Sequence, residues 1–360
     1  MTLAERAEAA RLRRVFEMAG AQPVDCAILQ PAETLLDLYG EDIRARAYVT
    51  SDPVRGEVML RPDFTVPVVQ MHMTDGAEPA RYTYAGEIFR RQEDHPERAS
   101  EYMQVGYEVF DGANPAAADA EVFAVIAETL AGLGLRAVTG DIGILTAAVA
   151  GLDTSERRRA ALMRHLWRPR RFRALLDRFA GRSPVPPTRA ALLAADDPMA
   201  AAGPMIGLRS ESEIAARIEA LRADAAEGPL AEGQLALIDA VLSVRETCPH
   251  ALEHLRDIAV DLPSLVPAVE RFEERCIALE ARGVDVTRLA FEASFGRTSM
   301  EYYDGFVFGL VADARPDLPP VATGGRYDAL TRQLGSGGAI PAVGGVIRPG
   351  LVLALGGGAS

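Results

Sequence analysis

Two groups of strand-like segments flank a long helical stretch, and this order restricts the folds that the chain can adopt. The first group ends near residue 110 and is followed by a predicted helix at Asp119–Leu133. Residues 152–280 have a mostly helical pattern, and strand-like patterns resume from Leu289. Few parallel βαβ crossovers are evident, which favours an α+β fold around an antiparallel β-sheet. We therefore predict a core formed by residues 1–151 and 281–360, flanked by helices and interrupted by a helical insertion at 152–280.

The clearest strands are predicted at Arg81–Arg90 and Glu101–Phe110, on either side of a charged stretch. In the first of them the alternation of apolar residues indicates a sheet with one buried face. Leu3–Ala19 has the period of an amphipathic helix, and Gly20 is placed as its C-terminal cap. Shorter strand-like runs lie at Val24–Leu29, Ala47–Thr50, Val58–Leu60, Phe306–Val311 and Gly324–Tyr327, and an apolar helix-like run lies at Val346–Leu355.

All 38 basic residues are arginine, so no lysine is present to form a Schiff base or to bind phosphate in a P-loop. Recognition of an oxyanion would depend on arginine side chains, helix N-termini or backbone amides. The net charge of −13 argues against a large nucleic-acid interface, because such interfaces place cations opposite phosphates.

The composition predicts a cytoplasmic protein. Cys26, Cys248 and Cys276 are widely scattered and form no disulfide framework, which is typical of a reducing compartment. No stretch approaches the ~18 apolar residues of a membrane span, and the N-terminus lacks a signal-peptide pattern. Cys248 lies near His250 and His254, but a fourth ligand and zinc-like spacing are missing, so we predict no metal site.

Five short segments resemble, in order and spacing, the core of the class II histidyl-tRNA synthetases. They are QPAE at 30–33, LRPDFT at 60–65, the second class II motif across 89–108, EYYDG at 301–305 and GGRYD at 324–328. One such motif alone would be weak, whereas five in register indicate a class II synthetase-like core. In that family the first segment forms a dimer interface, so the resemblance implies a homodimer.

The resemblance also implies a site for L-histidine. The family's arginine in the second motif, here Arg90, binds the ATP α-phosphate and the amino-acid carboxylate through its planar guanidinium. The other positions that would surround the ligand are Asp63, Thr65, Gln104, Glu108, Tyr302 and Tyr303. Purely structural roles stay open from the sequence: Arg90 could pair with Glu87 or Glu101, and the two tyrosines could pack within the sheet.

The catalytic positions of the synthetases have changed. Thr298 stands where they carry an arginine that stabilises adenylate formation, and Arg297 lies one position away, a shift that reverses the face of a strand. Leu351 occupies the position of the ATP-binding arginine of the third motif, and Pro349 is expected to disturb the helix start. Loss of one preorganised charge typically lowers a rate by ~10²–10³. We therefore predict no aminoacylation, no catalytic residues and no cofactor.

This combination resembles the regulatory subunits of ATP phosphoribosyltransferase, a non-catalytic synthetase-like family. The resemblance implies that the chain forms a hetero-octamer with the short-form catalytic subunit. It also implies that the chain is required for the first step of histidine biosynthesis and for feedback regulation, with L-histidine as ligand. The sequence stops at Ser360, soon after the third motif, so no anticodon-binding domain and no tRNA partner are expected.

Two other functions stay open at this stage. A divergent histidyl-tRNA synthetase would need Arg297 or Arg348 to supply the missing cations. A free-standing histidine sensor or RNA-binding module would use the arginine-rich stretch Arg157–Arg178 around Trp167, although such a stretch is more often a solvated helix face.

Overall fold

The computed structural model describes residues 1–39, 47–92, 98–200, 202–297, 302–335 and 338–356. Within these residues a nine-stranded sheet has the order β1-β5-β6-β12-β11-β10-β7-β9-β8. Its strands are β1 (Gln22–Pro23), β5 (Ala80–Phe89), β6 (Glu101–Phe110), β7 (Arg136–Asp141), β8 (Arg245–Thr247), β9 (Ala290–Glu292), β10 (Phe306–Val311), β11 (Ala322–Arg326) and β12 (Ala342–Ile347). The predicted α+β architecture is confirmed.

The sheet is mixed rather than purely antiparallel. The strands from β5 to β7 pair antiparallel, whereas β1 lies parallel to β5 and β9 lies parallel to β7. Parallel neighbours need a long crossover connection. The helices between β7 and β9 supply that crossover, which explains why the antiparallel prediction fails at this pair.

A second, three-stranded sheet contains β2 (Leu29–Pro31), β4 (Gly56–Leu60) and β3 (Val49–Asp52) in that order. The strand predicted at Val24–Leu29 is wrong except for its last residue. The chain leaves the large sheet after a hydrogen bond from Val24 N to Thr83 O of 2.9 Å, and it enters the small sheet only at Leu29.

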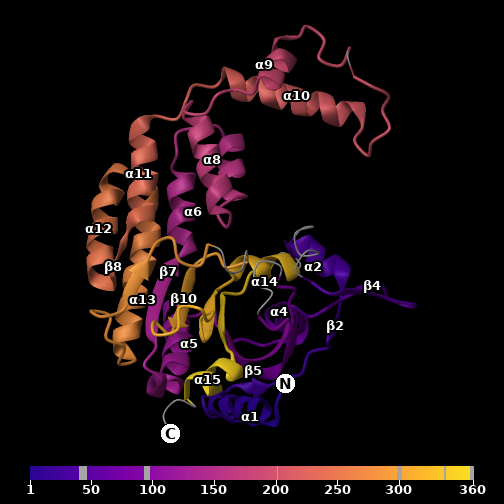
Figure 1. The fold of residues 1–360 in the computed structure, drawn as a ribbon. Helices are drawn as coiled ribbons and strands as arrows, with labels where there is room; N and C mark the ends of the chain where they lie inside the picture. The colour runs from indigo at the N-terminus through magenta and orange to yellow at the C-terminus, as the bar shows by residue number, and fades with distance from the viewer. Residues whose placement is uncertain (40–46, 93–97, 201, 298–301, 336–337, 357–360) are drawn as a thin grey trace.

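Helices cover both faces of the large sheet (Figure 1). One face packs against α1 (Leu3–Met18), α5 (Pro115–Thr129), η1 (Ala131–Leu133) and α15 (Pro349–Gly356). The other faces α4 (Thr65–Asp75) and α14 (Asp328–Leu334), and α2 (Ala32–Tyr39) packs against the small sheet. Tyr107 stacks on Phe16 at 5.2 Å on the first side, and Tyr84 stacks on Phe64 at 4.3 Å on the second. The candidate site lies on this second face.

Pro349 is the first residue of α15, so the expected disturbance of the helix start was wrong. Proline suits this position because the first helical N–H needs no acceptor within the helix and the ring already has a helical φ. The apolar run predicted as one helix is instead divided between β12, which ends at Ile347, and α15.

The segment between β7 and β9 is mostly helical. It contains α6 (Ile142–Ala150), α7 (Glu156–Met163), α8 (Pro169–Phe179), α9 (Pro187–Ala194), α10 (Glu211–Ala226), α11 (Glu232–Ser243), α12 (Cys248–Asp261), η2 (Pro263–Leu265) and α13 (Val266–Ala281). Helices α11, α12 and α13 lie together beside the sheet, and α9 and α10 form an arm that projects from the body (Figure 1). In the described part of the chain, no helix combines the length and apolarity needed to cross a bilayer.

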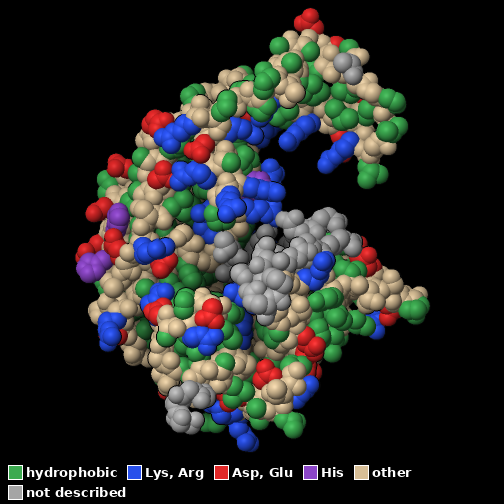
Figure 2. All heavy atoms as spheres, in the orientation of Figure 1, with side chains coloured by type: hydrophobic (Ala, Val, Ile, Leu, Met, Phe, Trp, Pro, Cys, Tyr) green, Lys and Arg blue, Asp and Glu red, His purple; other side chains and the backbone are tan. Residues whose placement is uncertain are grey.

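Arginine side chains gather on the inner side of the arm and of the helices beside it (Figure 2). Several are paired within the protein. Asp224 of α10 accepts hydrogen bonds from Arg158, Arg178 and Arg189 at 2.9, 2.8 and 3.3 Å, and Arg173 pairs with Asp239. Part of the arginine-rich stretch therefore holds the helices together.

Candidate functional site

The candidate site is built on the face of β6 that carries Gln104, Gly106 and Glu108. Alternation along β6 places these residues on one side, and the register sets Glu108 opposite Tyr82 on β5 and Gly344 on β12. Two glycines permit close approach. A Cβ at Gly344 would overlap the Glu108 carboxylate, and a Cβ at Gly106 would overlap the Tyr84 ring. The glycines of β6 and β12 therefore allow the Tyr84 ring and the Glu108 carboxylate to lie directly over the sheet.

Glu108 is the buried centre of this arrangement, with 1% of its surface exposed. Its Oε2 accepts a hydrogen bond from the Tyr327 hydroxyl at 2.6 Å, and its Oε1 accepts from Tyr84 at 2.8 Å and Thr65 at 3.2 Å. Burial raises the pKa of Glu108 to about 7, although the three hydroxyls favour the charged form. With this pKa the carboxyl group changes its charge near neutral pH, and the three hydroxyl groups determine its orientation.

Arg90 lies where β5 ends, beside Asp63. Its Nε donates to Pro62 O at 2.7 Å, and its Nη2 is 4.0 Å from Asp63 Oδ2. Asp63 is 4% exposed. Glu87, one of the two partners that the sequence left open for Arg90, contacts Arg6 at 2.9 Å.

The LRPDFT segment is fastened to β5 by Arg61. The Arg61 side chain is buried, donates through Nε to Glu87 O at 2.7 Å, and lies 4.0 Å from the Phe64 ring centroid. The backbone N–H of Phe89 in turn donates to Arg61 O at 3.1 Å. These contacts bring Asp63 and Thr65 to the sheet beside Arg90 and Glu108.

Tyr302 and Tyr303 form one wall of the site. Their rings meet edge to face at 4.9 Å, and the Tyr302 hydroxyl donates to Thr65 Oγ1 at 3.4 Å. Burial raises the pKa of Tyr303, and the negative charges of Glu108 and Asp63 raise it further. Thr298, the degenerate catalytic position, lies outside the described residues.

Gln104 completes the set of predicted residues. It is 1% exposed, and its Oε1 has no hydrogen-bond partner among the described residues. An unpaired buried acceptor costs free energy, so this atom is a candidate to receive a donor from a ligand. The seven residues predicted to surround histidine are thus brought together on one face of the sheet.

Sequence comparisons place this chain. The family described as histidyl-tRNA synthetase matches residues 2–226 and 214–349. The ATP phosphoribosyltransferase regulatory subunit of Brucella anthropi is 32% identical over 354 residues, covering 92% of this chain and 93% of the relative. That of Mesorhizobium japonicum is 32% identical over 368 residues, covering 96% of each. The chain belongs to the ATP phosphoribosyltransferase regulatory subunits, a histidyl-tRNA synthetase-like family.

Solved structures agree on the fold of this regulatory-subunit family. A protein described as an ATP phosphoribosyltransferase regulatory subunit/histidyl-tRNA synthetase from Bacillus halodurans matches with a TM-score of 0.68 at 19% identity, covering 98% of this chain and 79% of the other. Histidyl-tRNA synthetase from Nostoc sp. PCC 7120 matches with a TM-score of 0.66 at 17% identity, covering 98% and 72%. The class II synthetase-like fold is therefore confirmed.

In this regulatory-subunit chain, neither the altered position Leu351 nor Arg297, the neighbour of the altered position Thr298, contributes a cation to the site. Leu351 packs with the core on the opposite face of the sheet. Arg297 is buried at the insertion, where its Nε donates to Leu166 O at 2.8 Å and its guanidinium lies over the Phe172 ring. Burial lowers the pKa of Arg297 to about 10, and Arg173 adds to this effect.

Sequence reasoning missed residues that support Glu108. Tyr327 belongs to the GGRYD segment, and Tyr84 lies on the same face of β5 as Tyr82, so motif membership and alternation together could have found both. Arg348 was considered only as a displaced synthetase arginine. Its position on the site face depends on the pairing of β12 with β6, which lie far apart in the sequence.

A buried ionic cluster lies beneath the tyrosines. Asp119 of α5 contacts Arg326 at 2.7 Å and Arg275 of α13 at 3.5 Å, and Arg275 also contacts Asp141 at 2.8 Å. Arg326 directly precedes Tyr327 in the chain. Through this cluster, the insertion helix α13 is joined to the segment that supports Glu108.

Proposed function

We propose that this chain is a non-catalytic regulatory subunit that activates ATP phosphoribosyltransferase in the first step of histidine biosynthesis and conveys feedback regulation by L-histidine. One observation carries the proposal: the candidate site places the carboxyl groups of Glu108 and Asp63 on the same sheet face as the guanidinium of Arg90. Such a site suits a zwitterion, whose ammonium and carboxylate need opposite charges within one small volume.

Each group of L-histidine has a matching partner. The ammonium group fits Glu108 and Asp63, and the carboxylate fits the forked guanidinium of Arg90. The imidazole ring fits beside Tyr302 and Tyr303, with Gln104 Oε1 as acceptor for a ring N–H. Discrimination follows because a ligand that lacks these groups leaves buried polar atoms unpaired.

The absence of aminoacylation is part of the proposal. Adenylate formation builds negative charge on a transferring phosphorus centre, and enzymes stabilise that charge with preorganised cations. Leu351 supplies none, and Arg297 is directed into the insertion. One observation favours a divergent synthetase as a second candidate: Arg348 lies on the site face of β12.

The proposed assembly is a homodimer that joins the short-form catalytic subunit in a hetero-octamer in the cytoplasm, without tRNA. The names of the relatives support the partner, and α1 with the β2 segment would form the two-fold interface, as in class II cores. Light scattering of the chain alone and mixed with the catalytic subunit tests this assembly. A monomer that elutes separately from the catalytic subunit at micromolar concentration would contradict it.

A further inference from the structure

Arg348 lies on the same face of the sheet as Glu108. Gly344 faces the Glu108 carboxylate, and side chains of β12 alternate from there, so that residues 346 and 348 share this face. The ladder continues past the end of β12, because Arg348 N donates to Val321 O at 3.0 Å. By the same register, Arg348 comes level with Gln104 on β6.

The guanidinium of Arg348 has two neighbours, Pro320 just before β11 and Tyr102 on β6. Its Nη1 donates to Pro320 O, and the nearby Tyr102 acts to raise the pKa of Arg348. Tyr102 is in turn close to Arg90: burial would raise the pKa of Tyr102, but the charges of Arg90 and Arg348 hold it below its usual value. The register supports this placement: Tyr102 pairs with Ile88, two residues before Arg90, and Arg90 and Arg348 directly follow the ends of β5 and β12.

Two cations that lie close together in a buried place repel each other and destabilise the folded protein unless an anion lies between them. Burial lowers the pKa of Arg348, and the charge of Arg90 lowers it further. Asp63 Oδ2 lies 4.0 Å from Arg90 Nη2. An oxyanion placed between Arg90 and Arg348 would receive charge-assisted hydrogen bonds from both.

We propose that Arg348 is a specificity-determining residue that, together with Arg90, binds the carboxylate of the amino-acid ligand. The inference rests on the proposed histidine site and adds a residue to it. The shared chemistry is recognition of an oxyanion, which could also belong to a phosphate group. The carboxylate is the better fit, because Glu108, Asp63 and the unpaired Gln104 Oε1 on the same face match the cationic and N–H groups of an amino acid.

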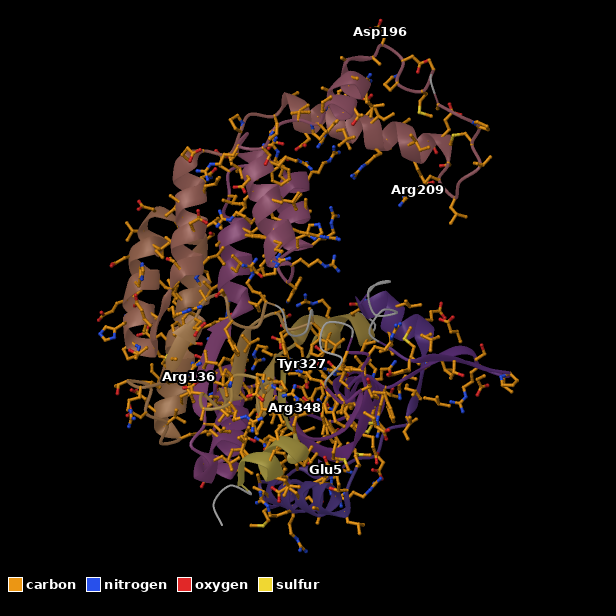
Figure 3. All side chains as sticks on the ribbon, viewed as in Figure 1. Glu5, Arg136, Asp196, Arg209, Tyr327 and Arg348 are labelled. Atoms are coloured by element: carbon orange, nitrogen blue, oxygen red, sulfur yellow. The ribbon has the colours of Figure 1, made fainter. Side chains whose placement is uncertain are left out.

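Calorimetry with L-histidine and L-histidinol tests the proposal, because histidinol keeps the imidazole and ammonium groups but carries a hydroxymethyl group in place of the carboxylate. The variants are Arg348→Met, Arg348→Lys and, as matched control, Arg136→Met. Arg136 is an exposed arginine of β7 that pairs with Asp313 at 3.0 Å, and it lies away from Arg348 (Figure 3). Thermal melting of each variant confirms that it folds.

The wild type is expected to prefer histidine over histidinol by about 10-fold to 100-fold, the range of a charge-assisted pair. Arg348→Met should weaken histidine about 10-fold or more and change histidinol affinity by less than about twofold. Arg348→Lys should fall between, because it keeps the charge and loses the planar fork. Arg136→Met should change neither affinity.

Three results would overturn the assignment of Arg348. Equal losses for histidine and histidinol would show a structural role, and an unchanged histidine affinity would show no role; both leave the proposed function standing. Binding of inorganic phosphate or ATP that Arg348→Met abolishes, with histidine unaffected, would assign the oxyanion to phosphate. If histidine binds neither the wild type nor its complex with the catalytic subunit, the proposed histidine site fails as well.

Discussion

The Tyr327 hydroxyl donates a hydrogen bond to Glu108 Oε2 over 2.6 Å, and so joins the GGRYD segment to the middle of β6. Both residues are buried, and Tyr84 and Thr65 contact the other oxygen of the same carboxyl group. Three hydroxyl groups from separate segments therefore determine how Glu108 is oriented. Removal of any one of these hydroxyl groups is therefore expected to change the orientation of the Glu108 carboxyl group.

Removing the Tyr327 hydroxyl should destabilise the protein. Tyr327→Phe keeps the ring and removes one donor to a buried carboxyl group, so we expect the free energy of unfolding to fall by about 1–3 kcal/mol. Urea denaturation measures the change. Tyr48→Phe is the control, because Tyr48 is 39% exposed and should change stability by less than about 0.5 kcal/mol. Equal losses in the two variants would refute the role assigned to the Tyr327 hydroxyl.

The affinity for L-histidine should depend on pH through Glu108. Its pKa of about 7 lies above the usual value of 4.5, so the carboxyl group becomes charged as the pH rises from about 6 to 8. Since the ligand's ammonium group prefers the charged form, affinity should rise by up to tenfold per pH unit below the pKa. Calorimetry across this range checks the slope. Glu108→Gln should bind weakly and without this rise.

The same pKa predicts a dependence of stability on pH with the opposite sign. The folded protein retains the Glu108 proton in an interval where the unfolded chain has released it, from about pH 4.5 to 7. The contribution of Glu108 to the free energy of unfolding therefore falls as the pH rises through this interval. Denaturation of the wild type and Glu108→Gln at several pH values separates this contribution from that of other groups. If the free energies of unfolding of the two proteins changed in parallel with pH, Glu108 would not be the source of the pH dependence.

The ionic cluster beneath the site should be costly to break. Arg275→Met leaves the buried Asp119 and Asp141 with less compensation, and we expect a loss of about 3–5 kcal/mol in the free energy of unfolding. Arg256→Met removes an ion pair with Glu273 in which both side chains are largely exposed, and should cost at most about 1 kcal/mol. A small loss for Arg275→Met would mean that the cluster is not needed to join α13 to the core.

No histidine-dependent exchange of pyrophosphate with ATP is expected above a control without enzyme. The reason is that Leu351 and the inward-directed Arg297 leave Arg90 without the other two cations that the synthetases place at the phosphorus centre. Radiolabelled pyrophosphate exchange measures this. Exchange that Arg90→Ala or Arg348→Met abolishes would instead support a divergent synthetase.

Much of this arrangement can be predicted from local pattern, and the rest depends on long-range pairing. Alternation in Arg81–Arg90 and Glu101–Phe110 predicts two strands that the structure confirms within one residue, because side-chain period and apolar content agree there. The expectation at Pro349 is wrong because the helix begins at this residue, the one helical position that favours proline, and the residues before it form β12.

The position of Arg348 could not be predicted in the same way. It depends on the register between β12 and β6, which are separated by the whole insertion and by β7 to β11. Local sequence does not encode which strands become neighbours across such a distance. The resemblance to the synthetases supplied the other site residues, and it pointed away from Arg348 because the family's arginine stands elsewhere.

The most direct test of the proposed function is the ATP phosphoribosyltransferase activity of the short-form catalytic subunit, measured with and without this chain over a range of L-histidine concentrations. We predict that the chain raises the activity, that histidine inhibits the complex, and that Glu108→Gln and Tyr302→Phe raise the histidine concentration needed for half inhibition by about tenfold or more while activation is retained. Activity that is indifferent to the chain would contradict the regulatory function. Activation with wild-type inhibition in both variants would place the regulatory histidine outside the Glu108 site.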